Sequence, residues 1–293
     1  MLQLLLGGSG SGKTTLLYQR IRARAEKGEK SILLVPEQFT SSTEGRIYRE
    51  LGDALSGMVE SFSFTSLAEK ILSTEGGAAV QTLSDAGRAV LVRRALEELQ
   101  DNVHYYHRHR RSAAFCQMAA QTIDELKSAG LSGQQLAQLA GACGAESGKL
   151  SELALIFQGY ETLLARSGMD PSDRLELAGA RLEEALARHS LPEFLRDRAV
   201  FIDEFDTFNA PKKRLLGAML AALPSVTVAL CDDGAPLLPG DLSLFSGAKQ
   251  VAAQLRQLAR KNGAEVAVPQ LLRKDLRHRN APGLAAVAEL LET

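Results

Sequence analysis

A glycine-rich stretch near the start of the chain has the residue types and spacing of a phosphate-binding loop. It reads Gly7-Gly8-Ser9-Gly10-Ser11-Gly12-Lys13-Thr14-Thr15 and fits the pattern GxxxxGK[ST]. Glycines let successive backbone N–H groups point at phosphate oxygens, and the lysine of this pattern reaches the β- and γ-phosphates. The hydroxyl that follows the lysine is a ligand for Mg²⁺. We therefore expect residues 7–15 to bind a nucleotide, with Lys13 as a catalytic group and Thr14 as a metal ligand.

Two adjacent carboxylates form the second candidate site. Asp203 and Glu204 directly follow an apolar run at residues 199–202. In phosphoryl-transfer sites an aspartate at a strand end holds Mg²⁺, and a neighbouring glutamate can polarise the attacking water as a general base. We therefore predict that Asp203 is a metal ligand and that both carboxylates are catalytic. A solvated acidic strand end is the alternative interpretation of the same pair.

Short apolar runs are the candidate strands that must position these residues. They lie at residues 2–6, 31–35, 58–64, 199–202 and 226–230. Short apolar strands joined by long connections indicate a parallel α/β sheet. The glycine-rich stretch follows the first run and precedes a helical pattern with Leu16, Leu17 and Ile21 on its apolar side. The loop is thus expected between a strand and a helix, which is the context that a phosphate loop requires.

Helical periodicity fills the long stretch between the third and fourth apolar runs. Apolar residues recur at helical spacing over residues 115–126 and 153–164, and glycines follow both segments at Gly130 and Gly168. We expect an α/β domain made of residues 1–75 and 190–293, with an all-helical insertion at residues 76–189 between its two parts.

Composition excludes several classes of protein. The chain has 293 residues, 34 Lys and Arg against 35 Asp and Glu, and a formal net charge of −1, which excludes a strongly basic DNA-coating protein but not a local DNA-binding groove. The three cysteines contain no CxxC pair, so neither a disulfide framework nor a zinc ribbon is expected. No apolar run is long enough for a membrane span and no basic segment precedes the first run, so we expect a cytoplasmic protein without a membrane partner.

The order of short motifs along the chain resembles that of superfamily 1 helicases of the UvrD and RecB type. The phosphate loop is followed by Pro36-Glu37-Gln38-Phe39-Thr40, by Ser61-Phe62-Ser63-Phe64-Thr65-Ser66-Leu67, by the helical stretch and by Asp203-Glu204-Phe205-Asp206. Residues 34–40, beside a chain that starts on the phosphate-loop strand, resemble more specifically the AddB family of bacterial helicase–nuclease subunits. Residues 226–233 resemble the strand that follows the acidic motif in that family.

This resemblance implies a fold and a set of partners. The α/β domain would be a RecA-like P-loop domain, helicase domain 1A, and the insertion would be similar to domain 1B. The implied cofactors are ATP and Mg²⁺, and the implied partners are DNA, as a single strand or a duplex end, and an AddA-type subunit in a heterodimer for recombinational repair. An iron–sulfur cluster belongs to the C-terminal part of longer family members and is not expected in this chain. We expect an N-terminal part of such a subunit, without helicase or nuclease activity of its own.

The same resemblance implies where DNA would bind. Single-stranded DNA crosses the top of the sheet in that family, so the implied contacts are Phe39, Thr40, Phe62, Phe64 and Thr65. Residues of this kind at strand ends could stack on a base or hold a phosphate. The alternative for Phe62 and Phe64, which their residue type favours, is a core position in an alternating strand.

Other interpretations of single segments stay open. Residues 104–111, HYYHRHRR, mix aromatic and cationic side chains, which suits either a strand-binding surface or a solvated loop. Residues 131–135, LSGQQ, resemble an ABC-transporter signature but lie far ahead of Asp203, which favours a turn between helices. A P-loop kinase and a scaffold that binds ATP and DNA without hydrolysis are the alternative functions.

Overall fold

The chain forms two compact units, which are described separately. The computed structural model describes residues 1–79, 81–144, 147–274, 276–277, 281, 283–284 and 286–287. The first unit, here called the sheet unit, comprises residues 1–75, 179–208 and 213–293, and the second, the helical unit, comprises residues 76–178 and 209–212. Within the described residues, no helix is long and apolar enough to cross a membrane.

A six-stranded parallel sheet forms the centre of the sheet unit. Its strands are β1 (Leu2–Gly7), β2 (Ser31–Leu34), β3 (Val59–Phe62), β4 (Ala199–Ile202), β5 (Ser225–Cys231) and β6 (Gln270–Leu272). They are arranged in the order β3-β2-β4-β5-β1-β6, and all pairs are parallel. The expected parallel α/β, RecA-like fold is thereby confirmed. Because β1 and β4 both flank β5, the segments that follow their carboxyl ends emerge at the same edge of the sheet.

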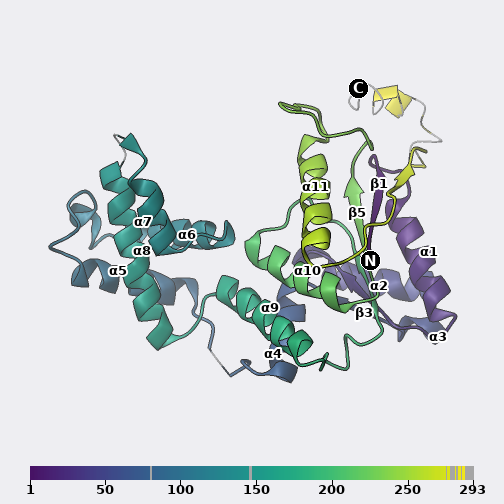
Figure 1. Cartoon of the computed structure of the whole chain (residues 1–293), viewed down its shortest axis with the longest axis horizontal. Coiled ribbons are helices and arrows are strands. Elements are labelled where there is room, and N and C mark those ends of the chain that lie inside the picture. The colour runs from purple at the N-terminus through teal and green to yellow at the C-terminus, as the bar shows by residue number, and fades with distance from the viewer. Residues whose placement is uncertain are drawn as a thin grey trace. The chain divides into compact units, whose positions relative to one another are not determined.

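Helices cover both faces of this sheet. They are α1 (Lys13–Ala25), α2 (Thr40–Leu51), α3 (Asp53–Ser56), α4 (Phe64–Glu75), α10 (Ala210–Ala222) and α11 (Ser246–Lys261), with a 3₁₀ turn η1 (Glu37–Phe39). Figure 1 shows α1 on one side of the sheet and α10 and α11 on the other. Leu17 and Ile21 of α1 are fully buried against Leu5, Leu33 and Phe201 of the strands. The apolar side of the first helical pattern therefore fixes α1, and with it the loop that precedes it, on the sheet.

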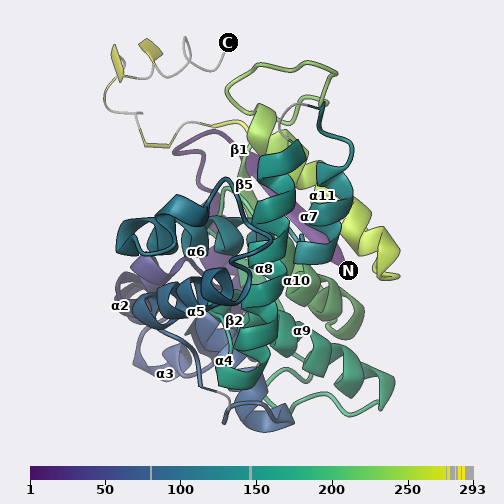
Figure 2. The ribbon, with the colours of Figure 1, turned by 90° about the vertical axis from the view of Figure 1, so that its left-hand side faces the viewer.

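The helical unit has its own apolar core. Its elements are α5 (Asp85–Glu98), the 3₁₀ turn η2 (His107–His109), α6 (Ala113–Ser128), α7 (Gly133–Ala140), α8 (Ser147–Ser167) and the start of α9 (Pro171–Ala187). Helix α8 packs on both α5 and α7, as Figure 2 shows, and α5 also packs on α6. Val92 of α5, Ile123 of α6 and Phe157 of α8 are buried together. An insertion with a closed core of this kind needs no strand to hold its helices.

One local expectation is wrong, one strand was missed, and one boundary differs. The expected strand at residues 58–64 ends at Phe62, because Phe64 begins α4 and buries its ring. Strand β6 was not expected, since three half-buried residues carry too short a pattern. The compact division places residues 179–189 in the sheet unit, whereas the sequence suggests the insertion. The assignment of the two units to helicase domains stays a prediction.

Candidate functional site

The glycine-rich loop joins β1 to α1 and owes its shape to its glycines. Gly10 and Gly12 have φ angles of 79° and 90°, in the left-handed region that side chains disfavour. A Cβ at Gly7 would lie 2.4 Å from the Ser11 hydroxyl and 2.6 Å from the carbonyl oxygen of Leu272. The turn therefore closes only with glycine at these positions, and it leads directly into the N-terminus of α1, where a helix favours negative charge.

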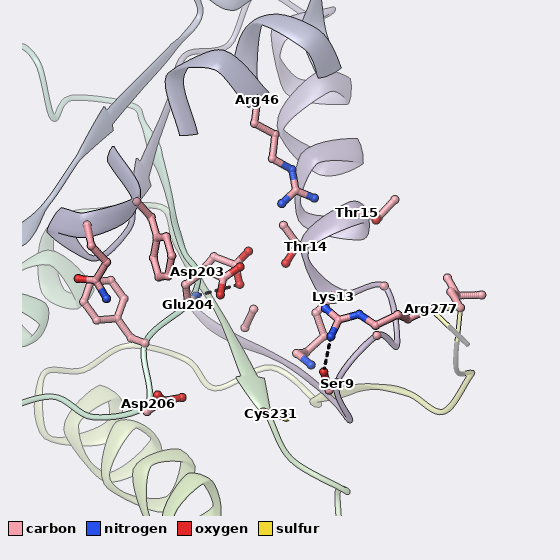
Figure 3. A pocket seen from close by; sticks show the side chains of 17 residues that line it. Ser9, Lys13, Thr14, Thr15, Arg46, Asp203, Glu204, Asp206, Cys231 and Arg277 are labelled. Atoms are coloured by element: carbon pink, nitrogen blue, oxygen red, sulfur yellow. Dashed lines mark hydrogen bonds between the residues drawn. The ribbon is translucent and has the colours of Figure 1, made fainter. Parts of the chain in front are cut away.

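Lys13 folds back over this loop. Its Nζ donates hydrogen bonds to the carbonyl oxygens of Gly7, at 2.7 Å, and Gly8, at 2.8 Å. The ammonium group is thus held at the mouth of the loop, beside the helix N-terminus. A cation in that position can pair with the terminal phosphates of a nucleotide. Figure 3 shows Lys13, Thr14 and Asp203 around one pocket.

Asp203 follows the end of β4 and meets the loop directly. Its carboxylate accepts a hydrogen bond at 3.0 Å from the backbone N–H of Glu204, and it lines the same pocket as the Thr14 hydroxyl, which lowers the pKa of the carboxyl. The residue is only 6% exposed, and this burial, with the nearby Glu204 charge, raises the pKa of the carboxyl above its usual range. The hydroxyl of Thr14 and the carboxylate of Asp203 are hard oxygen donors, which Mg²⁺ prefers. The two residues expected to hold the metal are therefore neighbours.

Glu204 is held in a strained backbone conformation at the same strand end. Its φ angle is 65°, which costs a residue other than glycine on the order of 1 kcal/mol. The side chain is exposed and lines the same pocket as Lys13. The sharp turn after Asp203 thus brings both carboxylates to one opening, although a regular strand would point them to opposite faces.

The pocket around these groups has a volume of about 690 Å³. It is lined by the residues of the loop and of the acidic pair and by Gln38, Phe39, Arg46, Phe205, Asp206, Ala229, Cys231, Leu276 and Arg277. A volume of this size is ordinary for a small-molecule site. The glycine loop, a buried carboxylate and several cations converge on it, which suits an anionic ligand that carries a metal ion.

Arg46 and Arg277 are site residues that the sequence interpretation missed. Arg46 extends from α2 toward Thr14 and Asp203 (Figure 3), and its guanidinium lies 4.9 Å from the ring centroid of Tyr18. Burial raises the pKa of Tyr18 to about 12, so its phenol stays neutral beneath the arginine. Arg277 donates from Nη1 to the Ser9 hydroxyl at 3.1 Å. No short pattern marks either arginine, because each arrives from a separate part of the fold.

The five residues that were expected to contact DNA lie in different environments. Phe39 is 39% exposed and lines the pocket, and Thr65 is exposed at the first turn of α4. The hydroxyl of Thr40 donates to the Glu37 carbonyl at 2.8 Å. The half-buried Phe62 has its ring centroid 6.5 Å from that of Phe194.

Phe64 is a core residue in this fold. Its ring is 3% exposed and lies edge-on to Phe205, at 5.2 Å between centroids, and to Phe208, at 6.0 Å. This aromatic cluster connects the start of α4 to the segment that follows the acidic pair. The ring of Phe64 is therefore buried and not exposed to a base. Its contact with DNA stays a prediction.

A metal site made of protein side chains alone is not seen among the described residues. No group of three or more His, Cys, Asp or Glu residues is placed to hold an ion in the part of the chain that the structure describes. A Mg²⁺ ion commonly takes only one or two protein ligands and completes its shell with water and substrate phosphates. The Thr14 and Asp203 pair fits that second type of site.

The family model and the curated relatives that match this chain all indicate the same family. A family model described as "ADDB, N-terminal" matches residues 4–288. The chain is 34% identical over 97% of its length to a protein of Desulforudis audaxviator named as the B-type subunit of an ATP-dependent helicase/deoxyribonuclease, and it covers 25% of that protein. Proteins of the same name from Moorella thermoacetica and Symbiobacterium thermophilum are 33% and 31% identical, over 97% and 99% of the chain. The chain spans about a quarter of the length of these curated relatives.

Proposed function

Because the chain belongs to the ADDB N-terminal family, we propose that it is the nucleotide-binding part of an AddB-type helicase–nuclease subunit that acts in DNA repair. The sheet unit would be helicase domain 1A and the helical unit would be similar to domain 1B. The bound nucleotide would be Mg-ATP. The single observation that carries this proposal is the convergence of Lys13, Thr14 and Asp203 on one pocket at the glycine-rich loop.

Each side chain of the site has a distinct task in this proposal. Backbone N–H groups of residues 8–13 would bind the α- and β-phosphates, and Lys13 would pair with the β- and γ-phosphates. Thr14 would ligate Mg²⁺ directly and Asp203 would hold it, directly or through water. The ion, when bound, neutralises charge on the terminal phosphates and orients them. Burial of Asp203 costs free energy until a cation arrives, so the site favours the metal-bound nucleotide.

Arg46 and Glu204 would act at the triphosphate end. The Arg46 guanidinium is held over Tyr18 and faces Asp203, close to the place of the γ-phosphate. Glu204 is exposed at the mouth of the pocket, where it could orient and deprotonate a water molecule. We expect slow hydrolysis by these 293 residues, since an arginine supplied from a facing domain contributes several orders of magnitude in related ATPases.

DNA would lie across the carboxyl edge of the sheet. Phe39 and Thr65 offer an exposed ring and an exposed hydroxyl there, and the half-buried Thr40 and Phe62 are further candidates. An AddA-type subunit is the proposed protein partner. Family membership and the exposure of these side chains support both roles.

Calorimetric titration of the chain with ATP tests the nucleotide site. We expect one site per chain, with an affinity that falls at least about tenfold when EDTA replaces Mg²⁺, because the Thr14 and Asp203 pair would then face the phosphates without a cation. Binding of equal strength in EDTA would contradict the proposed metal site, and absence of binding would contradict the proposed function.

A further inference from the structure

The helical unit carries an exposed apolar pocket at the aromatic and cationic segment of residues 104–111. The pocket has a volume of about 420 Å³ and includes Tyr105, Tyr106, His109, Phe115 and Met118 among its lining residues. Tyr105 and Met118 are 58% and 56% exposed. Large apolar side chains gathered at the surface of a protein commonly mark a binding site.

Ring stacking organises the floor of this pocket. The rings of Tyr106 and Phe115 are stacked, with centroids 5.4 Å apart and planes 28° from parallel. His109 lies over Phe115 at 5.5 Å, with an angle of 31°. Offset stacking at these distances is favourable and holds flat surfaces in fixed positions. A flat ligand can therefore extend an existing stack instead of creating one.

A buried carboxylate fixes the loop that presents these rings. Glu152 of α8 is 6% exposed and accepts hydrogen bonds from three consecutive backbone N–H groups. These are the N–H groups of His104 at 2.7 Å, Tyr105 at 2.9 and 3.0 Å, and Tyr106 at 3.2 Å. The loop is preorganised by these hydrogen bonds, and the Glu152 carboxylate that accepts them is buried. The loop then loses less conformational entropy when a ligand binds.

Basic residues are concentrated in the segment that supplies several rings of the pocket. Residues 104–111 hold three arginines and three histidines, and no acidic residue lies between Asp101 and Asp124 in the sequence. Arg108 and Arg111 are exposed in this segment, and Lys149 of α8 lies at the pocket. An apolar aromatic pocket that includes a lysine, in a segment with exposed arginines, is complementary to a ligand that alternates flat rings with negative charges.

We propose that this pocket stacks a base of single-stranded DNA while Arg108 and Arg111 contact the adjacent phosphates. Single-stranded DNA offers flat rings and negative charges in alternation, since each nucleotide combines an unstacked base with a charged phosphate. Arginine beside an aromatic ring adds a cation–π contribution to such sites. The inference rests on the proposed function only for the statement that the chain binds DNA. It places a second DNA contact on the helical unit, independent of the phosphate loop.

Fluorescence anisotropy with two labelled strands of equal length tests this site. One strand is oligothymidylate and the other carries abasic sugar–phosphate units, so only the first can stack. At fixed salt concentration we expect the full chain to prefer oligothymidylate, and Tyr105→Ala or Met118→Ala to weaken its binding by roughly 5- to 100-fold. Binding of the abasic strand should change little. Leu139→Ala is the matched control, because Leu139 is 51% exposed on α7 of the same unit.

Arginine variants test the phosphate contacts separately. Arg108→Ala and Arg111→Ala should weaken binding of both strands by the same factor and reduce the salt dependence of binding. Arg93→Ala and Arg94→Ala are the controls, since their side chains are 56% and 65% exposed on α5 and pair with Glu97 and Glu98. An unchanged salt dependence in the Arg108 and Arg111 variants would overturn this part of the proposal.

The outcomes separate this inference from the proposed function. Equal affinity of the wild-type chain for both strands, or an unchanged affinity in Tyr105→Ala, would overturn base stacking and indicate a protein-contact surface instead. Loss of DNA binding in Phe39→Ala combined with an unaffected Tyr105→Ala would overturn only the inference. Absence of all DNA binding, with Mg-ATP binding retained, would overturn the inference and the DNA part of the proposed function.

Discussion

Thr14, at the start of the first helix, and the buried Asp203, which follows the end of β4, line the same pocket. Neither residue is close to the other in sequence. They meet because β1 and β4 both flank β5 in a parallel sheet, whose carboxyl ends share one edge. This arrangement gives a concrete test of the metal site.

Replacement of Thr14 should separate metal binding from phosphate binding. Thr14→Val removes the hydroxyl at constant volume and should weaken Mg-ATP binding by about tenfold or more, while ATP binding in EDTA changes little. Thr14→Ser keeps the hydroxyl and is the matched control. Calorimetry with both variants measures the difference, and an equal loss in Thr14→Ser would show that packing rather than the hydroxyl matters.

Asp203→Asn should stabilise the chain in the absence of nucleotide. Burial raises the pKa of the Asp203 carboxyl, so the folded chain binds this proton more tightly than the unfolded chain. The charged form therefore lowers the free energy of unfolding above the raised pKa, and this penalty disappears as the pH falls through it. At neutral pH we expect the Tm of Asp203→Asn to be higher by a few degrees, since about 1 kcal/mol shifts Tm by roughly 2–4 °C in chains of comparable size.

Thermal unfolding of both proteins between pH 4 and 8 checks this sign. The stability difference should shrink toward acid, as the wild-type carboxyl takes up a proton and becomes neutral like the amide. Addition of Mg-ATP should reverse the order, because the wild-type carboxylate then gains a cation. A wild-type chain that is more stable than Asp203→Asn at neutral pH without nucleotide would contradict the assigned cost of burial.

Arg46→Ala should impair recognition of the triphosphate end. The Arg46 guanidinium lies over Tyr18 and faces Asp203 in the pocket, so its loss should weaken ATP binding by about fivefold or more and ADP binding by less. Competition of ATP and ADP against a fluorescent nucleotide measures the two affinities. Arg22→Ala, an exposed arginine in α1, is the control. Equal losses for ATP and ADP would place Arg46 away from the γ-phosphate.

Phe39→Ala should weaken single-stranded DNA binding without a loss of stability. Phe39 is 39% exposed at the pocket, and stacking of one base on an aromatic ring contributes about 1–3 kcal/mol. Tyr48→Ala is the control, because Tyr48 is 54% exposed on the nearby α2. Phe64→Ala should instead destabilise the fold by about 3–5 kcal/mol, as a core aromatic does. Unchanged DNA affinity in Phe39→Ala would remove this residue from the proposed DNA path.

The sequence was sufficient for the parts of the site that depend on local pattern. The loop at residues 7–15 and the acidic pair each follow an apolar run, and their strand and helix context is visible from neighbouring residues. The contacts made by Phe64 and Arg46 were not predictable in this way. The ring of Phe64 is buried by two phenylalanines that follow Glu204, and Arg46 reaches the pocket through the docking of α2. The strained φ angle of Glu204 also depends on the surrounding fold.

Thermal unfolding of the wild-type chain and of Lys13→Ala with and without Mg-ATP tests the central claim most directly. A ligand present at about 100 times its Kd stabilises the folded state by about 2.7 kcal/mol, so the wild-type Tm should rise clearly. The Tm of Lys13→Ala should be the same with and without Mg-ATP, because the ammonium at the mouth of the loop is gone. Lys27→Ala, an exposed lysine just beyond α1, should behave as the wild type. An equal rise in wild type and Lys13→Ala would contradict the assignment of residues 7–15 as the nucleotide site.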